Sequence, residues 1–157
     1  LVTDDDEASR KVGPYIQGAF ETNLPVITLS LTNIPKNNRI AKGKSGEFQI
    51  ILGGWNAIIP DPINIMDFAH SKTVFNYGGY NNAEVDRLLD AAENEDANAI
   101  VQRFEDIHAA EKIYMDELGV APLYHSSEAF LWNPNVKGIV RHSVGARYDF
   151  KNAYIVE

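Results

Sequence analysis

The first part of the chain passes from a short strand pattern to a helical one. Leu1–Thr3 is an apolar start, and apolar residues then recur at the three- and four-residue spacing of one helix face. Asp4, Asp5 and Asp6 precede that helix and suit its N-terminal cap and first turn, while Pro14 should kink the helix or displace its start. The residues of the predicted inner face are Val12, Ile16, Ala19 and Phe20.

Two further strands and one helix are predicted next. Apolar and polar residues alternate from Val26 to Asn33, which predicts a half-buried strand. Lys36–Lys44 is typical of a short polar helix that ends near Gly43 or Gly46, and Phe48–Leu52 is an apolar run suited to a buried central strand. Strands that alternate with helices connect by right-handed crossovers into a parallel sheet. The predicted fold class is therefore α/β, with a mainly parallel sheet flanked by helices.

The second part of the chain is predicted to form a helical subdomain and then a C-terminal β segment. A short helix is expected over residues 63–70, then a helix capped at Asn81 or Asn82, and a longer one from about Ala97 to Leu118. Two extended stretches follow, over 120–132 and 136–156. The residues expected to face inward from the last two helices are Val85, Leu88, Leu89, Ala92, Ile100, Phe104, Ile107 and Tyr114.

Open parallel sheets bind ligands beyond the carboxyl ends of their strands, which directs attention to the loop after Leu52. Two consecutive glycines begin this loop and would let another backbone come close. Within the loop, Trp55 is interpreted as a ligand contact or, alternatively, as a core aromatic residue. Asp61 fits a turn or helix cap better than a ligand contact. Tyr77 and Tyr80 are expected to be structural.

Composition narrows the class of protein. The 157 residues suffice for one domain, and 45% hydrophobic and 23% charged residues are typical of a globular one. A net charge of −8 argues against nucleic-acid binding, which needs a basic face. The chain has no cysteine, hence no disulfide or thiolate metal site, and no apolar run of about 18 residues that would span a membrane. Because it begins without Met, inside a predicted strand, we expect it to be a fragment.

No set of catalytic residues emerges from the sequence. His108 and Glu111 lie three apart on a predicted helix, a spacing that can place two metal ligands on one face. The second helix histidine of the H-E-x-x-H pattern is missing, and the phosphate-loop, dinucleotide and nucleophile-elbow motifs are absent. The sequence therefore predicts neither an enzyme nor a cofactor.

Several short stretches together resemble one known family. Trp55–Pro62 is similar to the W-x-A-D-Y-x-D/E-P signature of the oligopeptide-binding proteins, which are solute-binding proteins of ABC importers. Asn76–Asn82 with Asp86 resembles that family's N-Y-x-x-Y-x-N-x-x-x-D-x-L pattern. Closing stretches of similar kind are Ala121–Tyr124, Asn133–Gly138 and Tyr148–Ile155. These pieces follow the order of the family over nearly the whole chain.

The resemblance implies a fold, a ligand and a location. The fold would be the C-terminal lobe of a periplasmic-binding-protein type II fold, with residues 1–136 as the lobe and 137–157 returning to a missing N-terminal lobe. The ligand would be an oligopeptide, the partners ABC permease subunits, and the location extracytoplasmic, as a cell-surface lipoprotein or a periplasmic protein. The segment Gly54–Asn56 would offer its backbone to the peptide. The implied ligand-binding residues are Gly53, Gly54, Trp55, Asn56, Ala57, Ile58 and Asp61.

The chain departs from the family signature at Ile58, where the family has an aspartate that pairs with the amino group of the peptide. Ile59 likewise replaces a tyrosine. A buried ammonium without a counter-charge would cost several kcal/mol. The ligand would then be blocked, longer or non-peptidic, or Asp61 would supply the charge, or this copy has lost transport function. We favour altered ligand specificity.

Two other classes of function compete with transport. The chain could be an independent adhesion or sensing module that binds a protein through its aromatic loop, or a small metal-dependent hydrolase that uses His108 and Glu111. As a fragment, its terminal strands would either fold onto their own lobe or exchange with a second copy to form a dimer, because exposed strand edges seek pairing.

Overall fold

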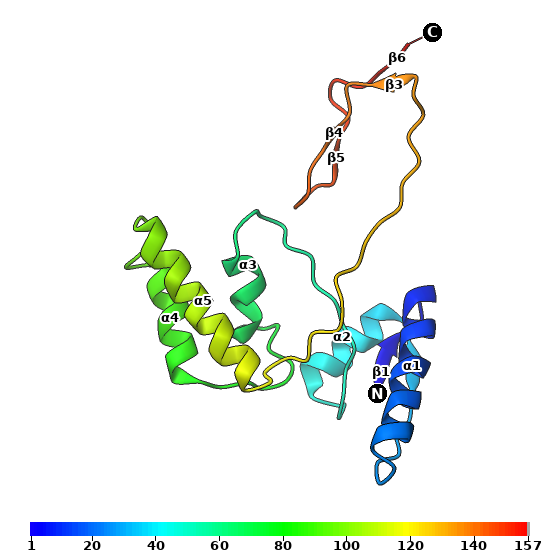
Figure 1. Ribbon diagram of the computed structural model, residues 1–157, viewed down its shortest axis with the longest axis vertical. Helices are drawn as coiled ribbons and strands as arrows, with labels where there is room; N and C mark the ends of the chain where they lie inside the picture. The colour runs from blue at the N-terminus through cyan, green and yellow to red at the C-terminus, as the bar shows by residue number, and fades with distance from the viewer. Residues whose placement is uncertain (157) are drawn as a thin grey trace. The chain divides into compact units, whose positions relative to one another are not determined.

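The structure is a computed structural model that describes residues 1–156 (Figure 1). The chain forms two compact units. The first comprises residues 1–55 and 72–80, and the second comprises residues 56–71 and those from 81 onward.

The first unit is built on a short parallel sheet. Strand β1 (Val2–Asp4) pairs in parallel with β2 (Thr32–Ile34), with Val2 opposite Thr32. On its other edge, Val2 forms a parallel bridge with Ile51, where the N–H of Leu52 donates to the Val2 carbonyl at 2.8 Å. The parallel arrangement is the predicted one, and β1 lies at its centre.

Two strand predictions need correction. The stretch 48–52 is not a central strand but a single bridge at the sheet edge, and the strand predicted from Val26 is regular only from Thr32. The cause is the length of β1, which ends at Asp4 because the aspartates that follow begin a helix. Three residues of β1 can pair with no more than a short stretch of either neighbour.

Two helices accompany this sheet. Asp6 caps helix α1 (Glu7–Asn23), because its carboxylate accepts a hydrogen bond from the Ser9 N–H at 2.9 Å. The helix continues on both sides of Pro14. The hydrogen bonds from the backbone and side chain of Ser9 lower the pKa of Asp6. Helix α2 (Lys36–Ser45) ends at Gly46 in a left-handed conformation, as predicted.

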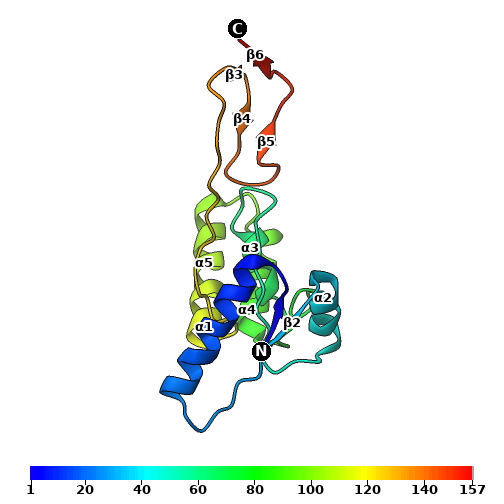
Figure 2. The ribbon, with the colours of Figure 1, turned by 90° about the vertical axis from the view of Figure 1, so that its right-hand side faces the viewer.

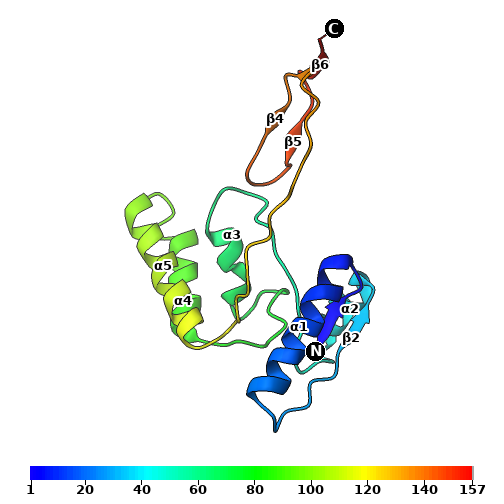
Figure 3. The same cartoon turned by 45° about the vertical axis from the view of Figure 1, so that its right-hand side comes forward.

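The second unit is a helical hairpin with a short covering segment. Helices α4 (Ala83–Glu93) and α5 (Ile100–Asp116) lie side by side (Figures 1 and 3), and Asn82 caps α4 by accepting from the N–H groups of its first turn. Helix α3 (Ile63–Met66) and the 3-10 turn η1 (Asp67–Ala69) pack against this pair. The buried side chains of the two long helices include Val85, Leu88, Leu89, Ala92, Ile107, Ala110 and Tyr114. Within residues 1–156, no helix combines the length and the apolar run needed to cross a membrane.

Two residues expected inside are outside. Ile100 is 69% exposed and Phe104 is 51% exposed. Both lie on the same helix face as the buried Ile107, but in the first turns of α5, where the facing segment at Pro60 and Asp61 leaves an open hollow. The apolar period of α5 agrees with the prediction, but no other segment of residues 1–156 covers the exposed side chains at its N-terminal end.

The chain after α5 is extended. Residues 120–132 form no strand and are exposed, and two small antiparallel pairs follow. Strand β3 (Val136–Lys137) pairs with β6 (Tyr154–Ile155), and β4 (Val140–Arg141) pairs with β5 (Tyr148–Asp149), as Figure 2 shows. The predicted C-terminal β segment is present as these two short ladders.

Candidate functional site

The loop that follows the bridge at Ile51 contains three residues whose backbone groups form no hydrogen bond within the described part of the chain. Among the hydrogen bonds of residues 1–156, none involves the N–H or C=O of Gly53, Gly54 or Asn56. All three residues are exposed, and a Cβ added to Gly54 would meet no atom within 4 Å. A backbone that is exposed and unpaired can form a ladder with another extended chain.

Gly53 lies against the guanidinium group of Arg39. A Cβ at Gly53 would come within 3.2 Å of Nη1 of that arginine. Arg39 is 7% exposed, and its Nε donates to Oδ1 of Asp4 at 2.6 Å. This buried ion pair joins α2 to β1, and its guanidinium group borders the start of the loop at Gly53.

Trp55 is partly exposed and also packs against another aromatic ring. Its side chain is 37% exposed, so it is not a core residue, and its ring centroid lies 4.7 Å from that of Phe75 with the planes inclined by 59°. Tilted aromatic pairs at this distance are mutually stabilising. Trp55 is therefore held in place by Phe75, while about a third of its surface faces solvent.

In the second unit, the residues after Asn56 are fixed by hydrogen bonds. The Ala57 carbonyl accepts from the Gly145 N–H at 3.3 Å, and the Ile58 N–H donates to Oδ1 of Asn64 at 2.8 Å. Ile58 remains 69% exposed. The backbone at these positions already has partners, and an apolar side chain is presented to solvent.

Asp61 is held by Arg103. Its carboxylate accepts from the Ile63 N–H and from Nη2 of Arg103, each at 3.0 Å, and Arg103 Nε donates to the Ala92 carbonyl at 3.0 Å. Partial burial disfavours the charged carboxylate, but the hydrogen bonds from Arg103 and Ile63 and the positive charge of Arg103 together lower the pKa of Asp61. The turn interpretation of Asp61 is confirmed by its bond to Ile63.

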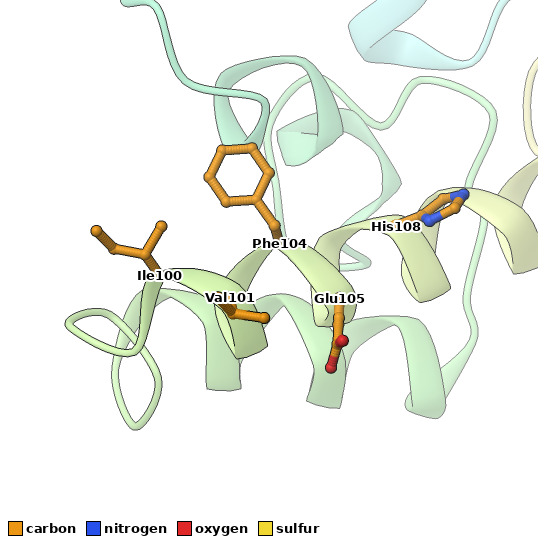
Figure 4. A pocket seen from close by; sticks show the side chains of 5 residues that line it. All are labelled: Ile100, Val101, Phe104, Glu105 and His108. Atoms are coloured by element: carbon orange, nitrogen blue, oxygen red, sulfur yellow. The ribbon is translucent and has the colours of Figure 1, made fainter.

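Two shallow hollows flank the N-terminal end of α5. One is lined by Pro60, Asp61, Ala92, Glu93, Ala97, Ile100, Arg103 and Phe104. The other is formed by α5 residues alone, and Figure 4 shows Ile100 and Phe104 projecting to the same side of the helix.

His108 lines the second of these hollows and is exposed, as is Glu111 on the same helix. Within the part of the chain that the structure describes, no three His, Asp or Glu residues lie close enough together to hold a metal ion.

Comparison with known proteins finds relatives that are similar to most of this chain. No protein-family model matches the chain. The oligopeptide-binding protein OppA of Bacillus subtilis is 33% identical over 150 residues, which are 95% of this chain and 27% of OppA. The chain is homologous to one part of the oligopeptide-binding proteins. A dipeptide-binding protein of Lactococcus lactis, 27% identical over 148 residues, again matches over 27% of its own length.

Solved structures of similar proteins agree. The pheromone receptor PrgZ, whose structure describes its mode of peptide binding, superposes with a TM-score of 0.84 at 29% identity, over 100% of this chain and 30% of the receptor. The substrate-binding domain of an oligopeptide ABC transporter from Bacillus anthracis gives 0.86 at 26% identity, over 100% of this chain and 31% of that protein. The predicted α/β lobe of a type II binding-protein fold is confirmed.

The relatives also bear on the class of protein. They are substrate-binding proteins rather than enzymes, and one of them, MppA of Escherichia coli, is a periplasmic murein peptide-binding protein. The chain spans about a quarter of the length of these relatives.

The sequence reasoning missed the side chains that hold the loop. Arg39 and Arg103 reach aspartates that are 35 and 42 residues away, and Asn64 fixes Ile58 by a side-chain bond. A lone arginine in a helix carries no local sign of such a partner. Asn64 lies six residues from Ile58, close enough in sequence that its turn-forming character was a usable signal.

Proposed function

We propose that this chain is part of the extracytoplasmic solute-binding component of an ABC importer, and that its ligand is an oligopeptide. The exposed, unpaired backbone of Gly53 and Gly54 carries this proposal, because a peptide can add to it as a strand whatever its side chains. Similarity to peptide-binding proteins over 95% of the chain supports the same conclusion.

In this proposal the seven residues from the loop act in different ways. Gly53, Gly54 and Asn56 offer backbone groups to the ligand, and Trp55 borders a side-chain pocket. Ala57, Ile58 and Asp61 follow in sequence and form the end of the binding segment. The chain performs no catalysis and needs no cofactor, because affinity comes from main-chain hydrogen bonds and from closure of two lobes on the ligand.

The remaining parts of the protein follow from the same proposal. Residues 1–136 would form the peptide-binding lobe, and residues 137–157 would return to an N-terminal lobe outside this sequence. ABC permease subunits would receive the ligand, and the protein would be periplasmic or a cell-surface lipoprotein. As an isolated chain, the terminal strands would fold onto their own lobe or exchange with a second copy.

The test is peptide binding by the full-length protein, meaning the gene product that contains residues 1–157, with Gly54 replaced by proline. Proline removes the N–H that would donate to the ligand, so affinity should fall at least about tenfold. The matched control is Gly78→Pro, because Gly78 is also exposed, its N–H has no hydrogen bond, and a Cβ there would meet no atom within 4 Å.

Circular dichroism must show both variants folded. Equal affinity of wild type and Gly54→Pro would contradict strand addition at this loop. Absence of peptide binding by the wild type, together with capture of a protein partner, would favour the adhesion or sensing module instead.

A further inference from the structure

The loop from Asn56 to Asp61 has a single acidic residue, and it is already neutralised. Asp61 is the only carboxylate between Glu47 and Asp67 in the sequence. Nη2 of Arg103 lies 3.0 Å from each of its two oxygens, and Oδ1 also accepts from the Ile63 N–H. The side chains of the pair are 31% and 15% exposed, so the partnership is only partly screened by water.

The side chain of Arg103 is itself held by two hydrogen bonds. Its Nε donates to the Ala92 carbonyl near the C-terminal end of α4, while Nη2 holds Asp61. Two bonds in different directions fix the planar guanidinium group, which leaves it little freedom to swing away from the carboxylate. A positively charged ligand group that approached Asp61 would therefore meet a carboxylate whose charge this arginine already balances.

The rest of the loop presents apolar groups. Ile58 is 69% exposed and Ile59 is 48% exposed. Two backbone groups that could otherwise bind a ligand already have partners. The Ile58 N–H donates to Asn64, and the Ala57 carbonyl accepts from the Gly145 N–H. Among residues 57–61, a charged end group of a ligand would therefore meet apolar side chains and backbone groups that already have partners, which is unfavourable where the bound ligand excludes water.

We infer that the ligand segment bound beside residues 57–61 is uncharged, so that the site takes peptides whose amino terminus is blocked or lies elsewhere along a longer chain. Arg103 is then a specificity-determining residue, because it pairs with the only carboxylate of residues 57–61. This inference rests on the proposed function and names the class of ligand for the same site.

One other carboxylate has to be weighed. Glu93 lines the hollow that also contains Asp61, and it is exposed. An exposed ion pair in water raises affinity by about fivefold at most, because solvent and salt screen it. Glu93 can therefore attract a cation weakly but cannot replace a carboxylate within the loop.

The experiment measures which end group the full-length protein prefers. One random hexapeptide library is made twice, with free and with acetylated amino termini, and the peptides captured from an equal mixture are quantified by mass spectrometry. The wild type should retain acetylated peptides at least as well as free ones. Arg103→Met, which frees Asp61, should shift the ratio about tenfold toward free amines, and Arg103→Met with Asp61→Asn should restore it.

A control and a second variant keep the outcome clear. Arg87→Met removes an arginine from an exposed ion pair with Glu84 in the same unit, and it should leave the ratio unchanged. Ile58→Asp adds a carboxylate without disturbing Arg103, and it should also favour free amines about tenfold.

A wild type that prefers free amines tenfold or more would overturn the inference and leave peptide binding intact. So would a loss of free-amine binding in Asp61→Asn alone, because Asp61 would then be the partner of the ligand. If neither library is retained, the proposed function fails and this inference falls with it. Unchanged ratios in both Arg103→Met and Ile58→Asp would likewise overturn it.

Discussion

Replacing Arg39 by methionine should lower the free energy of unfolding of the first unit by about 3 kcal/mol. The side chain of Arg39 is 8% exposed, that of its partner Asp4 is 19% exposed, and their Nε and Oδ1 atoms are 2.6 Å apart. Methionine retains most of the apolar stem, so packing is largely preserved and the change reports on charge. It leaves the carboxylate of Asp4 in a mostly buried place without its counter-charge.

The magnitude follows from burial. Removing one partner of a buried pair costs about 3–5 kcal/mol, whereas an exposed pair contributes less than about 1 kcal/mol. Asp4 retains some contact with water, which places the expected loss at the lower end of the first range. Asp4→Asn should cost a similar amount, because it leaves the guanidinium unpaired. The double variant should lose less than the sum of the two, with a coupling free energy of about 2 kcal/mol.

The assay is a double-mutant cycle measured by urea unfolding, with hydrogen exchange of the β1 amides to assign the effect to the first unit. Lys42→Met is the matched control, because Lys42 lies on the same helix and pairs with Glu47 at 3.3 Å with side chains 37% and 68% exposed. It should change stability by less than about 0.5 kcal/mol. A coupling energy between Arg39 and Asp4 below about 0.5 kcal/mol would show that water screens the pair, and the reasoning from burial would be wrong.

Three further predictions concern packing, pH and binding. Gly43→Ala should lower the free energy of unfolding by about 1–3 kcal/mol, because the new Cβ would lie 2.6 Å from Cδ2 of Tyr77. Gly18→Ala is the control: its new Cβ would meet no atom within 4 Å, and it should stabilise helix α1 by up to about 1 kcal/mol. Thermal unfolding of the two variants compares these effects. The pKa of Asp61 in the folded protein lies below its ordinary value of 3.8, so the stability that its charge contributes is present above pH 3.8 and is lost as pH falls through the folded pKa. Asp61→Asn should therefore make the free energy of unfolding depend less on pH in the acid range. An unchanged dependence would contradict the ion pair. Residues 1–157 alone should bind peptide at least about a hundredfold more weakly than the full-length protein, a difference of about 2.7 kcal/mol, and micromolar affinity of the isolated chain in calorimetry would refute the need for a second lobe.

The helices could be predicted because their signals are local. Asn82 directly precedes the apolar spacing of α4 and caps it, and the buried Leu88 and Leu89 fall on the predicted face. Burial depends on a second element, which a periodic pattern cannot supply. For that reason Ile107 is inside while Phe104, one turn earlier on the same face, is exposed.

The sheet and the loop were harder to predict, for a related reason. The apolar run 48–52 has the composition of a central strand, but the extent of its pairing is set by β1, which the aspartates end after three residues. The position of the loop could be predicted from Gly53 and Gly54. The pairing of Arg103 with Asp61 could not, because a contact across 42 residues has no signal in either neighbourhood.

A segment that binds by strand addition has to be ordered and yet unpaired, and these requirements conflict in an ordinary loop. Unpaired backbone is usually mobile, and ordering it on binding costs about 1–2 kcal/mol per residue. In this chain the anchors lie on either side of the open stretch in the sequence. Arg39 lies against Gly53 in the first unit, and the bonds of Asn64 to Ile58 and of Arg103 to Asp61 hold residues of the second unit. Under the proposed strand addition, each anchor lowers the ordering cost of the residues that it contacts, so the backbone groups of Gly53 and Gly54 contribute more of their hydrogen-bond free energy to affinity.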